Sequence, residues 1–316
     1  MVDFMKVYDI INNFNEAENT WKLGNSDYLL LGNMKELKTL GVILSLDSRN
    51  INECEEADFN CKISFFEKYL FTTVNVLKYE EGLIDSEQIK IFLSNDYILA
   101  IEEESENLVY NLIEDILRNR NSCILKEKPH CSTILYHIVD KIIIKNYEII
   151  SQLEREADKI ELDILKNPQH EHLNMLINLR RQVYKLKKFL SPLRYIGDGL
   201  ISNENEVITK ECLGYFSILN KKIEKLMQAL EVLVQDLALV REAFEAEMAN
   251  KTNELMKVFT LIATVFLPLN LITGMHGMNY ENIPFSNCPN GFWYMAIIMV
   301  CISMILIYIF KKKKWL

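Results

Sequence analysis

The C-terminal part of the chain lacks charge over two long stretches. No Asp, Glu, Lys or Arg occurs from Val258 to Tyr280, and none occurs from Asn282 to Phe310. Each stretch supplies the roughly 20 apolar residues that a helix needs to cross about 30 Å of hydrocarbon. Buried core helices can also be this apolar, but two in succession, at the end of a chain with 25% charged residues, argue against that interpretation. The sequence predicts a membrane protein with a large soluble part in front.

The N-terminus lacks a basic segment followed by an apolar core, so no signal peptide is expected. Lys251 and Lys257 precede the first apolar run, and Lys311 to Lys314 follow the second. The loop between the runs, residues 276–290, contains no Lys or Arg. The positive-inside rule therefore predicts that both termini are cytoplasmic and that the loop is external. The expected location is the plasma membrane, crossed twice.

Motifs of the common enzyme classes are also missing. The sequence has no G-x-S-x-G, no P-loop and no dinucleotide fingerprint, so neither an enzyme nor a bound cofactor is expected. The seven cysteines show no C-x-x-C spacing, which favours free thiols over disulfides or a zinc site. His170 and His172 flank Glu171, but on a helix they would point about 200° apart and could not share one ion. The net charge of −9 argues against nucleic acid as a partner.

Residues 1–128 combine strand and helix signals and are predicted to form an α+β cytoplasmic domain. Residues 62–79 and 87–104 are rich in Ile, Phe, Val and Tyr, which is typical of strands. Residues 34–46 and 107–120 have helical spacing. The order of the strands in the sheet does not follow from these patterns.

Residues 129–200 are predicted to form an antiparallel pair of helices. Residues 131–166 contain no Gly or Pro, "KNPQHEH" marks a break, and a second helix is expected from about His172 to Leu190. The Pro and Gly residues of "SPLRYIGDG" are expected to end it.

Residues 201–256 are predicted to form a long helical stalk. Ile223, Leu230, Leu237 and Phe244 recur at heptad spacing with Leu226, Leu233 and Val240 between them, which is the pattern of a coiled-coil seam. Since no helix breaker separates this seam from the first apolar run, one helix of roughly 100 Å is expected over about 205–275. Such a helix needs neighbours to bury its seam.

The first membrane helix, expected over 257–276, carries small and polar residues on one side. Asn253, Met256, Thr260, Ala263, Leu267, Asn270 and Gly274 are spaced alternately by three and four. An amide in hydrocarbon without a partner costs several kcal/mol, so Asn270 should face protein or water. The stripe alone is compatible with an interface between helices and with the lining of a pore.

The second membrane helix, expected over 291–310, has almost no polar side chains, and Trp293 and Tyr294 lie at its outer end. This is typical of a lipid-facing helix with an aromatic belt. Residues 277–290 are the expected external loop and 311–316 a basic cytoplasmic tail.

The sequence "GMN" at Gly277, Met278 and Asn279, directly after the first of two C-terminal membrane helices, resembles the signature of the CorA magnesium-channel family. The resemblance extends over nearly all of "NKTNELMKVFTLIATVFLPLNLITGMHGMNYE" and to the terminal "KKKKWL". The soluble part is similar to the family in its layout, with an α/β domain, two helices that fold back and a long stalk.

The resemblance implies a homopentamer in membrane lipid, with five first helices around a pore and the five GMN loops at its outer mouth as the selectivity filter. There Asn279 would hold hydrated Mg²⁺ through the ion's waters, and Gly277 would allow a tight turn and close backbone approach. Glu281, the loop's one acid, is compatible with a role in attracting cations and equally with a solvated charge. Carried over by position, the pore-lining residues would be Asn253, Met256, Phe259, Thr260, Leu267, Asn270 and Gly274, with Phe259 at the hydrophobic constriction.

The resemblance also implies regulation by Mg²⁺ bound between cytoplasmic domains. In this chain Ile218 stands in the stretch where the family pattern has an aspartate, so such a site would need other acids. A basic ring of Lys311, Lys312, Lys313 and Lys314 could face the acids of the helical pair, Glu154, Glu156, Asp158, Glu161 and Asp163, although these acids are equally compatible with a solvated helix face.

The leading hypothesis is a channel for Mg²⁺, with Co²⁺ and Ni²⁺ as further candidate ions. A zinc-transporting member of the same superfamily and a non-conducting, membrane-anchored coiled-coil scaffold are the alternatives.

Overall fold

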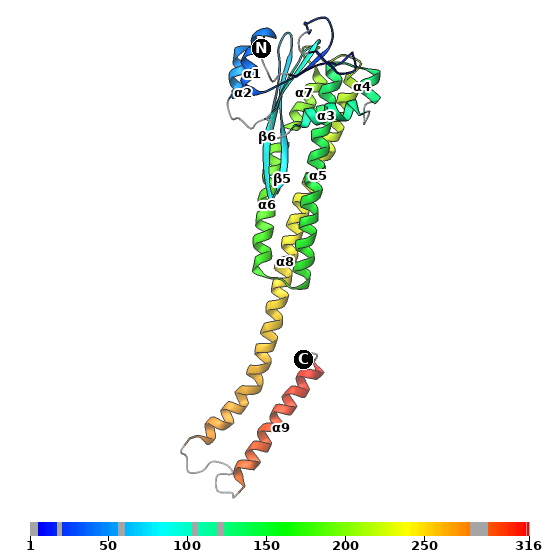
Figure 1. The fold of residues 1–316 in the computed structure, drawn as a ribbon. Coiled ribbons are helices and arrows are strands. Elements are labelled where there is room, and N and C mark those ends of the chain that lie inside the picture. Colours follow the sequence, from blue (N-terminus) through cyan, green and yellow to red (C-terminus); the bar gives the residue numbers. More distant parts are fainter. Residues whose placement is uncertain are drawn as a thin grey trace. The chain divides into compact units, whose positions relative to one another are not determined.

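The computed structural model describes residues 6–17, 21–55, 61–102, 107–118, 123–278, 290–313 and 315 (Figure 1). The chain divides into two compact units. One unit comprises Met1–Asp163 and His170–Arg241, and the other comprises Ile164–Gln169 and Glu242–Leu316. The first unit contains a sheet and a helical bundle, and the second contains both apolar helices.

One seven-stranded sheet forms the centre of the first unit, in the order β2-β1-β3-β7-β6-β5-β4. β3 and β7 pair in parallel, and every other neighbouring pair is antiparallel. The strands are β1 (Lys6–Asp9), β2 (Asn15–Glu16), β3 (Tyr28–Gly32), β4 (Lys62–Phe65), β5 (Leu70–Glu80), β6 (Leu83–Leu93) and β7 (Tyr97–Ile101). The strands expected within 62–79 and 87–104 are therefore confirmed.

Both faces of the central strands are buried. Leu30 and Leu99 point into one core with α1 (Met34–Ile43) and α2 (Ser48–Glu55), whereas Leu29 and Ile98 alternate with them and are buried on the other face. A capping box fixes the start of α1, where the Asn33 side chain accepts from the Glu36 amide and the Glu36 carboxylate accepts from the Asn33 amide. Two covered faces explain why these strands are continuously apolar.

The β5–β6 hairpin is the longest strand pair and attaches the sheet to two helices, α5 (Cys131–Lys166) and α6 (His170–Leu190). It turns at Glu81 and Gly82, both with positive φ, the combination that a type I′ hairpin turn requires. The Tyr79 hydroxyl donates to Glu156 of α5 at 2.7 Å. The Ile84 amide donates to Gln182 of α6 at 2.9 Å, and Lys185 of the same helix donates to the Ile84 carbonyl.

The helical part of the first unit packs α5, α6 and the first half of α8 (Leu213–His276) side by side (Figure 1). The predicted heptad seam is confirmed as a core stripe, since every one of its residues is at most 5% exposed: Ile223, Leu226, Leu230, Leu233, Leu237, Val240 and Phe244. The remaining described helices are α3 (Leu108–Leu117), α4 (Cys123–Glu127) and α7 (Leu193–Ser202).

Two boundaries differ from those expected. The segment "SPLRYIGDG" does not only end α6, because most of it forms α7, with Pro192 at the N-cap. The stalk helix α8 begins at Leu213 rather than near 201–205, since α7 ends at Asn203 in the left-handed conformation and an irregular segment follows. Gly197 explains part of this packing, because a Cβ there would lie 2.3 Å from the Asn220 side chain of α8.

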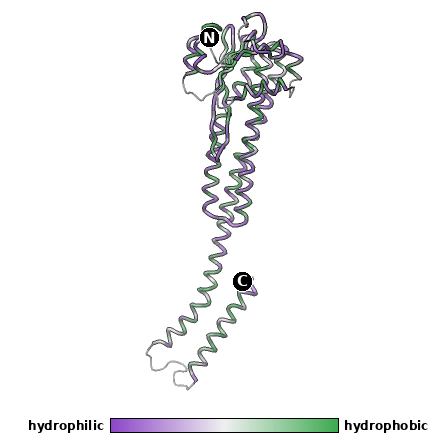
Figure 2. Tube along the Cα trace, in the orientation of Figure 1, coloured by the Kyte–Doolittle hydropathy of each residue, from purple (hydrophilic) through white to green (hydrophobic). Residues whose placement is uncertain are grey.

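The second unit consists of the turn between α5 and α6, the second half of α8, and α9 (Gly291–Lys312). α8 continues through Pro268 to His276, so the stalk and the first apolar run are one helix of 64 residues, about 96 Å long. Figure 2 shows the change from mixed to almost uniformly hydrophobic residues along α8, and the hydrophobic character of α9. Both helices are long and apolar enough to cross a membrane.

Candidate functional site

The membrane half of α8 presents a stripe of small and polar residues that no other described part of the chain covers. All its members are exposed: Asn253, Met256, Thr260, Ala263, Leu267, Asn270 and Gly274. Phe259 lies three residues after Met256 and four before Ala263, so it flanks the stripe, and it is 68% exposed. The structure therefore places every predicted pore residue on one helix, along one side of it. Their role in lining a pore stays a prediction.

The polar groups of this helix differ in how they are satisfied. The Thr260 hydroxyl donates to the Met256 carbonyl at 2.8 Å, and the Thr264 hydroxyl donates to the Thr260 carbonyl at 2.7 Å. The Asn270 side-chain amide is exposed and makes no hydrogen bond to the residues that the structure describes. Threonine hydroxyls are thus compatible with hydrocarbon, whereas Asn270 requires water, an ion or another polypeptide beside it.

The two glycines at the end of α8 are not required by the conformation of a single chain. A Cβ on Gly274 would meet nothing within 4 Å, and one on Gly277 would meet carbonyl oxygens only at 3.5 Å. Gly277 also has a φ outside the left-handed region, since Gly24 and Gly82 are the described glycines with positive φ. Gly277 lies in a turn, where its amide donates to the Thr273 and Gly274 carbonyls, and its role at the mouth of a pore stays a prediction. Close approach of a helix from another copy of the chain would explain a glycine at either position.

The rest of the predicted filter falls mainly outside the described residues. Met278 is described and exposed, whereas Asn279 and Glu281 lie outside the described residues. Of the predicted basic ring, Lys311 and Lys312 form the last turn of α9; Lys313 is its C-cap, and Lys314 is not described.

The candidate regulatory residues lie on the helical bundle. Ile218 is 49% exposed on α8, and no group of three or more His, Cys, Asp or Glu side chains positioned for a metal occurs among the described residues. Glu156 is engaged by Tyr79, as described above. His170 is exposed at the first position of α6, and His172 is half-buried two residues further along the helix.

Sequence reasoning missed a contact between the α5–α6 turn and α8. The Lys251 ammonium donates to Asn167 Oδ1 at 2.8 Å and to the Pro168 carbonyl at 3.2 Å. Two residues after Lys251, the stripe begins at Asn253. The sequence "KNPQHEH" predicted a break between two helices here. A break does not identify the residues that the turn contacts.

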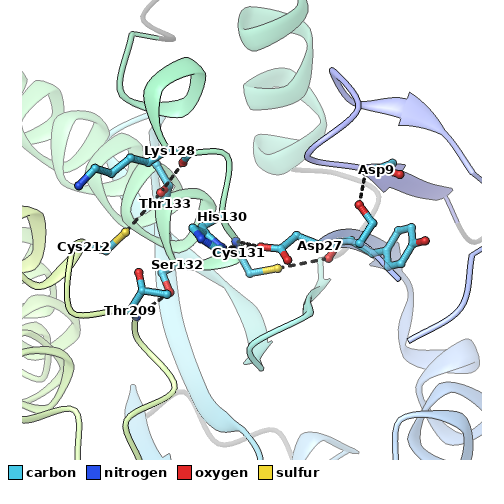
Figure 3. A network of polar contacts seen from close by, with 11 residues as sticks. Asp9, Asp27, Lys128, His130, Cys131, Ser132, Thr133, Thr209 and Cys212 are labelled. Carbon is cyan, nitrogen blue, oxygen red and sulfur yellow. Dashed lines mark hydrogen bonds and ion pairs between the residues drawn. The ribbon is translucent and has the colours of Figure 1, made fainter. Parts of the chain in front are cut away.

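A cysteine, a histidine and an aspartate also meet at the start of α5, which sequence reasoning did not foresee (Figure 3). His130 Nδ1 lies 2.8 Å from Asp27 Oδ2, and the Cys131 amide donates to the same oxygen at 3.3 Å. The Cys131 thiol is buried against the Tyr28 carbonyl, and burial raises the pKa of that thiol. A protonated, buried thiol is a poor nucleophile. The contacts of this network join the start of β3 to the start of α5.

The comparisons with known proteins agree with this arrangement. Residues 32–312 match the family model described as "CorA-like Mg2+ transporter protein". The chain is 29% identical over 257 residues to the cobalt/magnesium transport protein CorA of Thermotoga maritima, covering 81% of this chain and 72% of that protein. It is 26% identical over 284 residues to the protein of the same name from Methanocaldococcus jannaschii, covering 88% and 86%.

A solved structure extends the likeness to the whole fold. The complete structure of the CorA magnesium transporter from Methanocaldococcus jannaschii superimposes with a TM-score of 0.83 at 21% sequence identity, and each chain is covered completely. This supports the α+β domain, the long helix and the two apolar C-terminal helices as one known architecture. Since the family model matches most of the sequence, the chain belongs to the CorA family.

Proposed function

We propose that this protein conducts divalent cations, principally Mg²⁺, through a pore lined by the α8 stripes of several copies. Family membership and the two apolar helices make it a membrane protein of a family of transporters, not enzymes. The names of the Thermotoga and Methanocaldococcus relatives support Mg²⁺ and Co²⁺ as the ions. Five copies is the number that the family resemblance implies, and both termini are proposed to be cytoplasmic.

The observation that carries the proposal is the exposed Asn270 amide within an uncharged helix. Asn270 lies well inside the uncharged run, on the same side of α8 as Asn253, Thr260 and Gly274. Such a row of small and polar residues fits a path for a hydrated cation. Mg²⁺ dehydrates reluctantly, so neutral oxygens can hold it through its waters. The absence of carboxylates from Val258 to Tyr280 keeps binding weak enough for release. The membrane potential contributes about 2.3 kcal/mol per charge per 100 mV, twice that for a divalent ion.

The test is Mg²⁺ flux into dye-loaded liposomes that contain the purified full-length protein. Asn270→Ala and Asn279→Ala are compared with the native chain at equal protein content. Asn250→Ala is the matched control, because Asn250 is exposed on the same helix before the apolar run and lies within 3.5 Å of Glu247. We expect Mg²⁺ flux from native protein and the control, and a loss of at least about tenfold in both test variants.

The alternatives give different outcomes in the same assay. Flux of Zn²⁺ without Mg²⁺ would identify a zinc-transporting member of the family. If none of Mg²⁺, Zn²⁺ and Co²⁺ passes, the result would support the non-conducting scaffold instead of a channel. Equal flux in native protein and Asn279→Ala would remove Gly277, Met278 and Asn279 as the selectivity filter.

A further inference from the structure

The end of α9 gathers cations that have no counter-charge of their own. Lys311 and Lys312 form the last turn of the helix, and Lys313 is its C-cap. All three side chains are exposed, and they make no ion pair within the described part of the chain. The sequence contains no Asp or Glu from Asn282 onward, so the segment cannot neutralise its own lysines. A partner that supplies negative charge is required to pair with them.

Trp315 folds back onto the same end of the helix. Its amide donates to the Phe310 carbonyl at 3.1 Å, and its indole stacks on the Phe310 ring, with the ring centres 5.9 Å apart and 25° between the planes. Phe310 is 9% exposed, whereas Trp315 is 46% exposed. The indole N–H makes no hydrogen bond to any described residue. An aromatic ring that is covered on one side and keeps a free donor is typical of the interface between membrane and water.

The length of α9 places this cluster at the edge of the hydrocarbon. Residues 291–310 contain no charged side chain and form about 30 Å of helix, which equals the hydrocarbon thickness of a typical bilayer. Lys311 is the first charged residue after this run. With α9 across a membrane, Lys311, Lys312 and Lys313 therefore lie at the level of the lipid headgroups.

The directions of the lysines favour lipid over a protein surface as their partner. Consecutive helical residues point about 100° apart, so Lys311 and Lys312 point away from the side that carries Phe310 and from one another. Lys313 continues this rotation, because its amide donates to the Ile309 carbonyl at 3.0 Å. A protein surface that approaches from one side reaches one or two such lysines. A headgroup layer surrounds the helix and reaches all of them.

The polar side-chain groups at this end of α9 are all donors. Cations in the last turn interact favourably with the helix dipole, but that interaction involves backbone carbonyls and leaves the ammonium groups available to an anion. Three ammonium groups and an indole N–H offer hydrogens and no acceptor. The ligand must therefore carry negatively charged acceptor oxygens, as a phosphodiester does.

We propose that Lys311, Lys312, Lys313 and Trp315 form a binding site for the phosphodiester headgroups of anionic phospholipids. The lysines attract the negative headgroups, since basic residues beside a membrane helix add to its affinity for anionic lipid. Trp315 lies at the boundary between acyl chains and headgroups, with its ring on Phe310 and its N–H toward the lipid oxygens. The inference rests on α9 crossing the membrane and not on ion conduction.

The test measures which lipids surround Trp315 in the full-length protein. Trp21→Phe with Trp293→Phe leaves Trp315 as the one tryptophan, because the sequence has three. The protein is placed in vesicles of phosphatidylcholine and phosphatidylglycerol, and one lipid at a time carries bromine, which quenches a nearby indole. We expect phosphatidylglycerol to be enriched around Trp315 by about fivefold or more over its share of the bilayer. Quenching by each lipid in proportion to its share would overturn the site.

Lysine replacements test whether the cations cause the enrichment. Gln at Lys311, Lys312 and Lys313 together should lower it by about threefold or more, and added salt should lower it in the native chain by screening. The matched control removes three exposed lysines of the first unit instead: Lys35→Gln, Lys210→Gln and Lys221→Gln. This control should keep the native enrichment. If the first variant keeps it too, or the control loses it, the lysines do not select the lipid.

The place of the bromine tests the folded-back tryptophan. Bromine near the headgroup end of the acyl chain should quench Trp315 more strongly than bromine near the chain end. If neither position quenches, Trp315 lies in water and the proposal fails. Inorganic phosphate is the second probe and should leave the quenching unchanged at millimolar concentration. Competition by free phosphate would identify a phosphate site, and the lipid site would be overturned.

Quenching requires no ion gradient, so its outcome is independent of transport. Selective quenching without Mg²⁺ flux would support the lipid site and remove the proposed function. Flux without selective quenching would support transport and overturn the lipid site.

Discussion

The Nζ atom of Lys251 lies 2.8 Å from Oδ1 of Asn167 and 3.2 Å from the carbonyl oxygen of Pro168. The turn between α5 and α6 is thereby fastened to α8 directly before the stripe that begins at Asn253. A contact between a turn and a helix at this point links the ends of α5 and α6 to the helix that carries the first apolar run.

Replacing Lys251 should loosen that turn. Lys251→Met removes both hydrogen bonds, which at an exposed site contribute about 1 kcal/mol together, so amide hydrogen exchange in 164–169 should accelerate about fivefold. Asn167→Ala should have a smaller effect because the Pro168 carbonyl still accepts. Exchange measured by mass spectrometry checks both, with Lys257→Met as the control. Unchanged exchange in Lys251→Met would show that the turn is held by other contacts.

Replacing Asn146 should stabilise the helical bundle. Asn146 is fully buried on α5, and neither its amide nitrogen nor its amide oxygen has a hydrogen-bond partner among the described residues. Because an unsatisfied buried polar group costs about 1–3 kcal/mol, Asn146→Leu should raise the free energy of unfolding by a similar amount.

The measurement is chemical denaturation of the full-length protein in detergent, followed by helical circular dichroism. Leu153→Ala, a fully buried position on the same helix, is the comparison and should cost about 2–5 kcal/mol. If Asn146→Leu lowers stability, a bound water satisfies the amide in solution.

Cys61 should be unreactive and should make stability depend on alkaline pH. Burial raises the pKa of its thiol from the ordinary 9.0 to about 11. At pH 8 its thiolate is therefore about a hundredfold scarcer than that of a free cysteine, and alkylation should slow accordingly until the protein is unfolded.

The sign of the pH effect follows from the same shift. The folded state favours the neutral thiol, so this contribution to stability is present below pH 9 and is lost as the pH rises from about 9 to about 11. Cys61→Ala should remove the part of the loss of stability at alkaline pH that this thiol causes. Mass-spectrometric alkylation rates and denaturation midpoints at pH 8, 9.5 and 11 measure the two effects. Fast alkylation of the folded protein at pH 8 would contradict the burial.

Gly274→Ala should affect transport without affecting the single chain. Since a Cβ at Gly274 meets nothing within 4 Å, the denaturation midpoint should not change. In the proposed pore, copies of this residue approach one another, so the added methyl groups should lower Mg²⁺ flux by several-fold, about threefold or more. Gly214→Ala is the matched control, because it is equally open but lies at the N-terminal start of α8, far from the apolar run. Equal flux in both variants would place Gly274 away from the conduction path.

Periodicity predicted the elements whose residues satisfy one simple pattern. The seam from Ile223 to Phe244 repeats every seven residues because it packs along straight neighbouring helices, so its burial was visible in the sequence. α5 was bounded correctly for a similar reason, since no Gly or Pro interrupts 131–166. The family resemblance adds a hypothesis that periodicity does not contain, namely that Gly277, Met278 and Asn279 form a filter, and this stays a prediction.

Contacts between distant segments were not predictable in this way. The pairing of β3 with β7 joins residues that no local pattern relates, and so does the hydrogen bond from Lys251 to Asn167. α7 was missed because Pro192, Gly197 and Gly199 read as breakers. The structure uses Pro192 to start the helix, and it uses Gly197 and Gly199 to let α7 approach Asn220 and Ile63 closely.

The unbroken course of α8 limits which insertions and deletions this gene can tolerate. The buried seam ends at Phe244 and the exposed stripe begins at Asn253, and the same helix carries both. One residue inserted between them would turn the entire stripe by about 100° relative to the seam, although no residue of either would have changed. Seven inserted residues would nearly restore the phase, displacing the stripe by about 10 Å along the axis. Length variation here should therefore occur in steps of seven.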